Sequence, residues 1–202
     1  MPAQIWTQLL TPQQQASGSA FGTFTTAKSV INPQSLIDLP RNFFAVGTKL
    51  RHRISMGIGS LVTTPGTVTF EIHLGTIAIW SSGAIQLNAT AHTIRPAVLE
   101  VTNVCQVVGT GTTAKCLGIG KLTGVMFTAT IAATDSWGRV SAADAKVSDV
   151  TLVVPIASPA QGTGFDSTIS TLLDFYVGFS VSDAANTVQV FDYEVEGVNY
   201  SS

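Results

Sequence analysis

The glycine-rich run Gly118–Gly124 is the stretch whose residue types come nearest to a known chemical motif. A phosphate-binding loop reads Gly, four residues, then Gly-Lys-Ser/Thr, so that backbone amides and a hydroxyl meet phosphate and magnesium. Around Gly120-Lys121 the first glycine is replaced by Lys115, and the hydroxyl residue is replaced by Leu122. No helical pattern follows that would supply a positive N-terminus. The run therefore predicts strand glycines at a bulge or a close backbone approach, and no phosphate site.

Metal-ligating and nucleophilic residue types are present but do not converge. The three histidines lie on separate segments: His52, His73 and His92. Glu71 and His73 would share one face of a strand, yet two ligands are too few to define a metal site. No serine stands in the Gly-x-Ser-x-Gly pattern that exposes a nucleophile. We therefore predict a non-enzymatic protein without a cofactor or a metal site.

Charged residues alternate along two segments of the chain. The acidic set lies near the C-terminus: Asp192, Glu194 and Glu196. A strand would place these on one face and turn the residues between them toward the core: Phe191, Tyr193 and Val195. The basic set comes earlier: Lys49, Arg51 and Arg53. Two interpretations remain open, namely a solvated face, or opposition of the two sets on adjacent strands or across a subunit interface, favourable by about 0.2–1 kcal/mol per pair.

The two cysteines, Cys105 and Cys116, are placed symmetrically about Thr110-Gly111. They should lie opposite each other on a long hairpin that spans Thr93–Ile131. A two-residue loop would make them a hydrogen-bonded pair, which is awkward to bridge. A four-residue loop, Gly109–Thr112, would make them a non-hydrogen-bonded pair with closer side chains. Because a cytoplasmic product normally keeps its cysteines reduced, we expect buried free thiols.

Composition indicates one large β domain with an uncharged surface. The chain has 202 residues, of which 45% are hydrophobic and only 11% are charged, against roughly 25% charged in typical soluble domains. No stretch approaches the roughly 20 apolar residues of a membrane-spanning helix. The net charge of −2 and the pI of about 5.8 argue against a nucleic-acid partner. So little charge favours association with copies of the same chain.

Short apolar alternations between turn signals predict strands and no amphipathic helix. We expect a first strand over residues 22–31, a second hairpin from 171–181 and 187–198, and others over 43–47, 49–62, 68–74, 77–80, 84–87 and 147–156. The long central hairpin needs a second sheet to cover its apolar face. The sequence therefore predicts an all-β protein, an antiparallel β-sandwich that is jelly-roll-like, with residues 21–202 as a single domain.

Residues 1–20 differ from the rest, since they lack an alternation that fits a closed sheet. They predict an extended N-terminal arm with a small apolar patch: Ile5, Trp6, Leu9 and Leu10. One interpretation is a frayed terminus. The other is an arm whose Trp6 docks on a neighbouring subunit, because such a patch is costly when exposed. The start of the chain lacks a secretory signal pattern, which predicts synthesis in the cytoplasm.

Several strings of strand and turn residues resemble structural proteins of tailed bacteriophages. They are LVTTPGTVTFEIHLG, IQLNATAHTIRP, VLEVTNVCQVVGTGTTA and GTGFDSTISTLLDF. The resemblance implies a jelly-roll virion component and brings no catalytic motif with it.

We therefore expect a virion protein, a capsid decoration or head-associated protein that forms a homo-oligomer, with a trimer as one candidate. Its partners would be itself and other virion proteins such as the major capsid protein, with no nucleic acid and no membrane. The candidate interaction residues are the apolar patch, both charged sets and Trp137. Alternatives are a tail or fibre component, or a carbohydrate-binding jelly roll that stacks sugars on Trp80, Trp137 or Tyr200.

Overall fold

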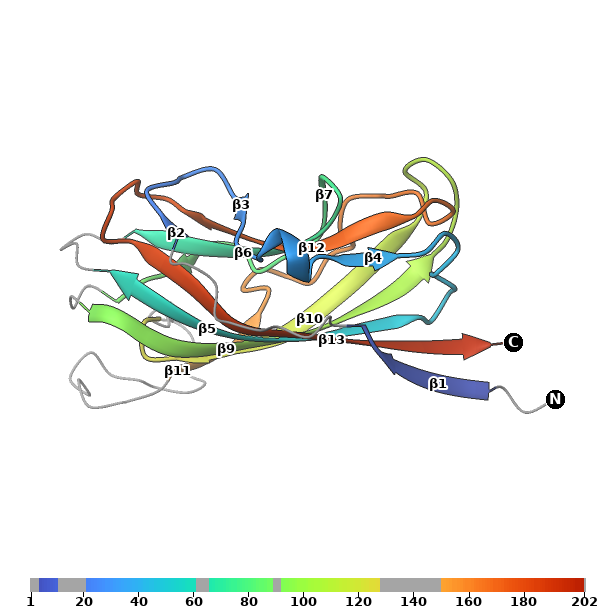
Figure 1. The fold of residues 1–202 in the computed structure, drawn as a ribbon, viewed down its shortest axis with the longest axis horizontal. Helices are drawn as coiled ribbons and strands as arrows, with labels where there is room; N and C mark the ends of the chain where they lie inside the picture. The colour runs from blue at the N-terminus through green and yellow to red at the C-terminus, as the bar shows by residue number, and fades with distance from the viewer. Residues whose placement is uncertain (1–3, 11–20, 61–65, 89–91, 128–149, 202) are drawn as a thin grey trace.

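The computed structural model describes residues 4–10, 21–60, 66–88, 92–127 and 150–201. These residues form two antiparallel β-sheets, and their only helical element is one 3-10 turn, Pro33–Ser35. Figure 1 shows the two sheets as stacked layers. In the described part of the chain no helix is long and apolar enough to cross a membrane. The predicted all-β sandwich is confirmed.

The larger sheet has seven strands and carries the longest ones. Its order is β1 (Gln4–Leu9), β13 (Thr187–Ser201), β5 (Lys49–Ser60), β9 (His92–Val107), β10 (Lys115–Gly124) and β11 (Val150–Val154), with β2 (Phe21–Gly22) also paired to β13. The predicted central hairpin corresponds to β9 and β10, which lie inside this sheet.

The smaller sheet has six strands. Its order is β3 (Lys28–Ser29), β12 (Thr171–Phe179), β6 (Thr67–Leu74) and β7 (Ile77–Ser81), with β4 (Ile37–Leu39) paired to β12 and β8 (Ile85–Gln86) paired to β6. The pairs β5/β13 and β6/β12 lie in opposite sheets, so two paired strands cross together from one layer to the other. This ribbon is the jelly-roll-like part of the topology.

The expected hairpin of residues 171–181 and 187–198 is wrong, because β12 and β13 belong to different sheets. The connection between them is held by local hydrogen bonds. The buried Asn186 side chain donates to the Val181 carbonyl at 3.1 Å, and the Ala185 N–H donates to the Asp183 carboxylate at 2.8 Å. These bonds lie in the connection by which the chain passes from the smaller sheet to the larger one.

Two other expected strands are also corrected. Residues 22–31 are divided between β2 and β3, which lie in different sheets. The chain bends at Thr23, where φ is +64°, and Phe24 enters the core beside Phe179 with 5.6 Å between ring centroids. Residues 43–47 form a loop rather than a strand. Its phenylalanines are nevertheless buried, and they supply the apolar alternation that indicated a strand.

The core lies between the sheets, and inward residues alternate with outward ones over the first part of β5 and of β6. On β5 the inward residues are at most 2% exposed: Leu50, His52, Ile54 and Met56. On β6 they are at most 3% exposed: Val68, Phe70, Ile72 and Leu74. Phe70 stacks on Phe175 of the adjacent strand, with ring centroids 6.0 Å apart. Both predicted inward faces are confirmed.

Strand β13 breaks the alternation once. The β5–β13 register shifts between Val190 and Asp192, which makes Phe191 the extra residue of a β-bulge. Phe191 is therefore 40% exposed and not in the core, contrary to prediction, whereas Tyr193 and Val195 are buried as expected. Its ring lies over Gly57, where an added Cβ would meet Phe191 Cζ at 2.8 Å.

The N-terminal segment is part of the sheet, which corrects the prediction of an unpaired arm. Residues Gln4–Leu9 form β1 and pair with Glu196–Ser201 of β13. The β5 pairing of β13 ends at Val198, so the last residues of β13 pair only with β1 among the described residues. Figure 1 shows the two strands projecting together beyond the rest of the sandwich. Residues 11–20 lie outside the described part.

The loop of the central hairpin is longer than either length expected for it. Strand pairing ends at Val107 and Lys115, and Gly111 has φ of +66° within the loop. The loop docks on a later segment, because the Gly109 N–H donates to Ser167 Oγ at 2.9 Å and the Gly111 N–H donates to Asp166 Oδ2 at 2.8 Å. Contacts distant in sequence therefore set the loop length.

Candidate functional site

The predicted acidic and basic sets face each other on neighbouring strands of the larger sheet. In the register of β5 and β13, Arg51 lies opposite Glu196 and Arg53 lies opposite Glu194. Arg51 Nη1 donates to Glu196 Oε2 at 3.1 Å. The two side chains are 55% and 35% exposed, so the pair contributes about 0.2–1 kcal/mol to folding. Opposition of the two sets on adjacent strands is confirmed.

The outer members of each set do not join this pairing. Asp192 follows the bulge and lies opposite Ser55, and Lys49 lies opposite Val198. Asp192 is exposed and Lys49 is half-buried. The sets therefore meet through two of their three members.

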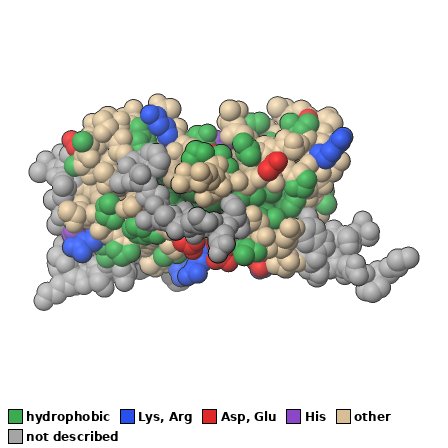
Figure 2. Space-filling view, in the orientation of Figure 1, with side chains coloured by type: hydrophobic (Ala, Val, Ile, Leu, Met, Phe, Trp, Pro, Cys, Tyr) green, Lys and Arg blue, Asp and Glu red, His purple; other side chains and the backbone are tan. Residues whose placement is uncertain are grey.

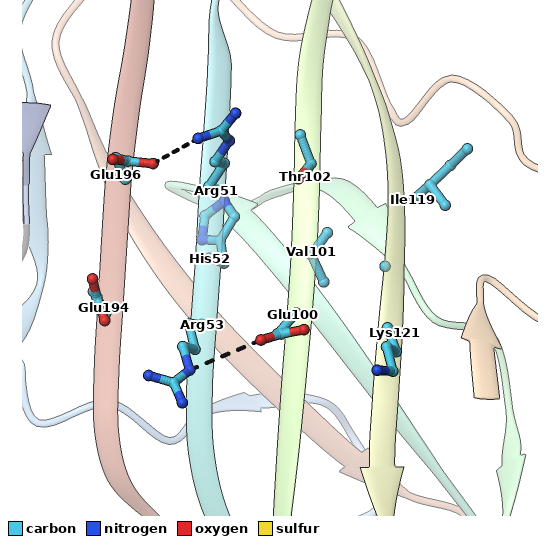
Figure 3. Close-up of a pocket in the computed structure, with 11 residues that line it drawn as sticks. Arg51, His52, Arg53, Glu100, Val101, Thr102, Ile119, Lys121, Glu194 and Glu196 are labelled. Carbon is cyan, nitrogen blue, oxygen red and sulfur yellow. Dashed lines mark hydrogen bonds and ion pairs between the residues drawn. The ribbon is translucent and has the colours of Figure 1, made fainter. Parts of the chain in front are cut away.

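A row of four charges crosses the larger sheet at one level. Glu194 on β13 lies opposite Arg53 on β5, Arg53 lies opposite Glu100 on β9, and Glu100 lies opposite Lys121 on β10. We call these four residues the charge ladder. Figure 3 shows their side chains on four adjacent strands, with Arg53 turned toward Glu100. The Arg53 Nε to Glu100 Oε1 distance is 3.9 Å.

Glu100 and Lys121 are not among the interaction residues predicted from the sequence. Each lies at an outward position of the central hairpin, and each is exposed. Their opposition could have been predicted from the hairpin, because residues whose numbers add to 221 face each other across β9 and β10. The sequence does not show that β5 and β9 are adjacent in the sheet, because β6, β7 and β8 of the smaller sheet lie between them along the chain.

A shallow depression of about 450 Å³ lies over the ladder and the Arg51–Glu196 pair. Its charged side chains are three basic and three acidic ones: Arg51, Arg53, Lys121, Glu100, Glu194 and Glu196. Ile119, which is 49% exposed, adds an apolar edge. A surface with balanced charge offers no field that favours a polyanion such as nucleic acid. Its pattern suits a surface with the complementary alternation of charge.

Of the predicted apolar patch, the structure describes the side chains of Leu9 and Leu10. Leu9 is 61% exposed at the end of β1, and the Leu10 N–H donates to the Val195 carbonyl at 2.8 Å while its side chain packs against the core. Ile5 and Trp6 lie in β1 opposite Tyr200 and Asn199. The side chains of these four last-named residues, and the whole of Trp137, lie outside the described part.

A second hollow of about 520 Å³ opens beside the end of β1. It lies between Leu9 and Leu10 on one side and the segment from Leu36 to Phe43 on the other. Its lining contains one acid and one base, Asp38 and Arg41.

The interior of the larger sheet holds a buried polar pair. Tyr193 Oη lies 3.5 Å from His52 Nδ1, and the two rings stack with centroids 6.3 Å apart. Burial lowers the pKa of His52 to about 3 and raises the pKa of Tyr193. Both groups are therefore neutral at physiological pH, and both are buried, with His52 2% exposed and Tyr193 without exposed surface.

The other candidate ligands gather on the outer face of the smaller sheet. His73 Nε2 lies 2.9 Å from Glu71 Oε2, and the His73 ring stacks on Tyr176 with 3.9 Å between centroids. Asp174 lies opposite His73 and accepts from Ser29 Oγ at 2.9 Å. Burial raises the pKa of Asp174. Among the described residues no three such groups are arranged to hold a metal ion.

The cysteines lie directly opposite each other and are buried and free. Cys105 Sγ donates to the Val107 carbonyl at 3.4 Å. The hydrogen bond with Cys105, together with burial, raises the pKa of Cys116. The expectation of free thiols packed as small hydrophobes is confirmed.

One proposed sugar-stacking platform is excluded by burial. Trp80 is 4% exposed and packs in the core, beside Gly118, where an added Cβ would collide with Trp80 and with Asn103. The close backbone approach predicted for this glycine-rich run is found at Gly120, where an added Cβ would meet the Glu100 carbonyl oxygen. The other two platforms, Trp137 and the Tyr200 side chain, lie outside the described part.

The chain matches no protein family and no curated protein sequence. Among solved structures it is similar to the CBM2 module of the evolved Dit of Lactobacillus casei BL23 phage J-1. The two chains are 10% identical, the match covers 95% of this chain and 80% of that one, and the TM-score is 0.34.

Proposed function

We propose that the protein is a non-enzymatic phage virion structural protein, a capsid decoration or head-associated protein that assembles with copies of itself. Its β1/β13 ribbon is the assembly element, and the major capsid protein is its second partner. The likeness of its strand and turn strings to structural proteins of tailed phages supports the virion class. The observation that carries the assembly mechanism is the unprotected outer strand β1.

Strand β1 ends the larger sheet, since in the described residues it pairs only with β13. Soluble proteins usually protect such a strand with charged side chains, proline or a bulge, because its free N–H and C=O groups recruit other strands. The β1 sequence QIWTQL contains no charge, no proline and no glycine. Its isoleucine, tryptophan and threonine favour strand pairing. An edge of this kind suits addition of a strand from another chain.

The rest of the described surface supports the same proposal. Large hydrophobic side chains are exposed at scattered places, including Val153 at 72%, Val46 at 63% and Ile169 at 57%. Figure 2 shows few charged side chains, with uncharged polar and hydrophobic atoms over most of the visible face. A low-charge surface is easily buried between subunits, since few ions lose their water.

The virion assignment is tested by locating the chain in particles. Purified phage particles from the source should contain it in many copies by quantitative mass spectrometry. An electron-microscopy reconstruction of those particles should place it on the head shell. Absence of the chain from purified particles would overturn the proposal, and density in the tail would replace head decoration with a tail role.

The assembly element is tested with the exposed Leu9 of β1. Leu9→Lys adds a charge to the free strand and should abolish association through β1 and weaken particle binding without lowering the melting temperature. Leu172→Lys is the matched control, because Leu172 is 47% exposed on the smaller sheet. Equal association of both variants and the wild type would remove β1 from the mechanism.

A further inference from the structure

The charge ladder has an electrical polarity that its neighbours within the chain do not cancel. Its order across the sheet is acid, base, acid, base, from Glu194 through Arg53 and Glu100 to Lys121. The inner two approach each other at 3.9 Å. The ends are exposed, and no ion pair is formed by Glu194 or Lys121 within the described residues. One edge of the ladder is therefore negative and the other is positive.

The ends of the ladder are three strands apart, which is about 14 Å at the usual spacing of neighbouring strands. At physiological ionic strength the Debye length is about 8 Å. Glu194 and Lys121 therefore gain little from each other within one chain. A second surface placed over the sheet could bring an opposite charge within a few ångströms of each.

The alternation is antisymmetric about its midpoint between Arg53 and Glu100. A copy rotated about an axis that runs along the strands presents the ladder in reverse order. Glu194 then faces Lys121 of the copy, Arg53 faces Glu100 of the copy, and both contacts occur twice. A two-fold axis in the perpendicular direction, along the ladder, would set like charges against each other. Only one of the two face-to-face arrangements is thus complementary.

We propose that the outer face of the larger sheet binds a second copy of this chain about a two-fold axis parallel to the strands. This deepens the proposed function by naming a second self-association surface, distinct from β1, and it rests on the proposed function only in supposing that copies meet. The strand axes of the two sheets would then be aligned, as in the aligned packing of stacked sheets, and each strand would face a strand of the copy that runs in the opposite direction. The shallow depression and the exposed Ile119 give the copy a surface to fill.

Charge-reversal variants test the pairing of the ladder ends. In a dimer of Lys121→Glu chains, the new carboxylate of each chain would face Glu194 of the other chain. In a dimer of Glu194→Lys chains, the new ammonium group of each chain would face Lys121 of the other chain. Each variant alone should have a dimer dissociation constant raised about tenfold or more, since two contacts of about 1 kcal/mol are each reversed in sign. A mixture of the two variants should form a heterodimer with both contacts restored, at close to the wild-type dissociation constant.

Sedimentation velocity at low and at physiological salt measures these constants, with one variant fluorescently labelled for the mixture. Leu9→Lys is introduced into every chain, so that association through β1 does not contribute. Lys28→Glu and Asp38→Lys are matched controls, because both residues are exposed on the smaller sheet. They should leave the dissociation constant unchanged.

Three results would overturn the inference. They are a monomeric Leu9→Lys chain at low salt and high concentration, single variants that dimerise as tightly as their parent, and a mixture that associates no better than either variant alone. The first of these leaves the proposed function standing if the unmodified chain still assembles through β1. If neither the Leu9→Lys chain nor the unmodified chain associates, both proposals are overturned.

Discussion

The two faces of the larger sheet are built from the same strands yet have opposite chemistry. On β5 the inward Ile54 has no exposed surface, and its neighbour Arg53 is exposed on the outer face. On β13 the buried Tyr193 stands beside the exposed Glu194. The inner face encloses neutral groups in a packed core, whereas the depression on the outer face is lined by six charged side chains whose net charge is zero. Folding free energy comes from the first face, and we propose that the second face selects the partner.

This contrast follows from the different energies of the two kinds of contact. Burial of a large apolar side chain stabilises a fold by about 1.5–3 kcal/mol, while an exposed ion pair contributes about 0.2–1 kcal/mol. Alternating charges on an exposed face are thus a weak means of stabilising a sheet. The same charges can, however, determine which of two orientations a second surface adopts when it binds.

The largest expected contrast lies between neighbouring residues of β5. Ile54→Ala should lower the free energy of unfolding by about 2–5 kcal/mol, because it leaves a cavity between the sheets. Arg53→Ala should lower it by less than about 1 kcal/mol. Urea denaturation of both variants measures the difference. Similar losses in the two would contradict the division of roles between the faces.

A second contrast lies on β10. Gly118→Ala should lower the free energy of unfolding by about 1–3 kcal/mol, because the new methyl group meets Trp80 and Asn103 in a packed interior. Ile119→Ala on the outer face should cost less, since that side chain is 49% exposed. Thermal melts of the two variants compare them directly. A neutral Gly118→Ala would show that the interior has room at this place.

The buried histidine gives the inner face a pH dependence. The folded-state pKa of His52 is about 3, below the unfolded value of about 6.5. The unfolded chain therefore binds more protons between these values, so stability is present above pH 6.5 and falls as the pH is lowered toward 3. From pH 7 to pH 5 the loss should be about 2 kcal/mol.

The control for this prediction is His52→Phe, which fills a similar volume without a titratable group. Its free energy of unfolding should fall less between the same two pH values, and the difference between the two proteins isolates His52. Identical pH dependence in both would mean that His52 is solvated or paired when the protein is folded.

The smallest effect is expected for the exposed pair on the outer face. Arg51→Ala removes the 3.1 Å contact with Glu196 and should change the free energy of unfolding by about 0.2–1 kcal/mol, less in high salt. Chemical denaturation at two salt concentrations measures it. If Arg51→Ala lowered the free energy of unfolding by several kcal/mol independently of salt, this pair would contribute to stability as much as a buried core residue does.

The sequence was sufficient for what depends on local alternation. The inward faces of β5 and β6, the opposition of Cys105 and Cys116, and the strand conformation of residues 118–124 all follow from residue period and spacing. The two-sheet architecture follows as well, because a long one-sided hairpin must be covered.

Long-range pairing could not be obtained in this way. Alternation is the same whether a segment returns along its own sheet or crosses to the other, so residues 171–198 were expected to form a hairpin. The bulge at Phe191 shifts the alternation by one residue, and the sequence carries no mark of it. The charge ladder depends on β5 lying between β13 and β9, which single-chain spacing does not reveal.

We propose that this chain acts by associating with copies of itself. Sedimentation velocity of the unmodified protein over a range of micromolar concentrations measures that association. We expect species at whole-number multiples of 21.1 kDa, with dissociation promoted by Leu9→Lys and by reversal of Lys121 or Glu194. A single monomeric species at every concentration and salt level would contradict it.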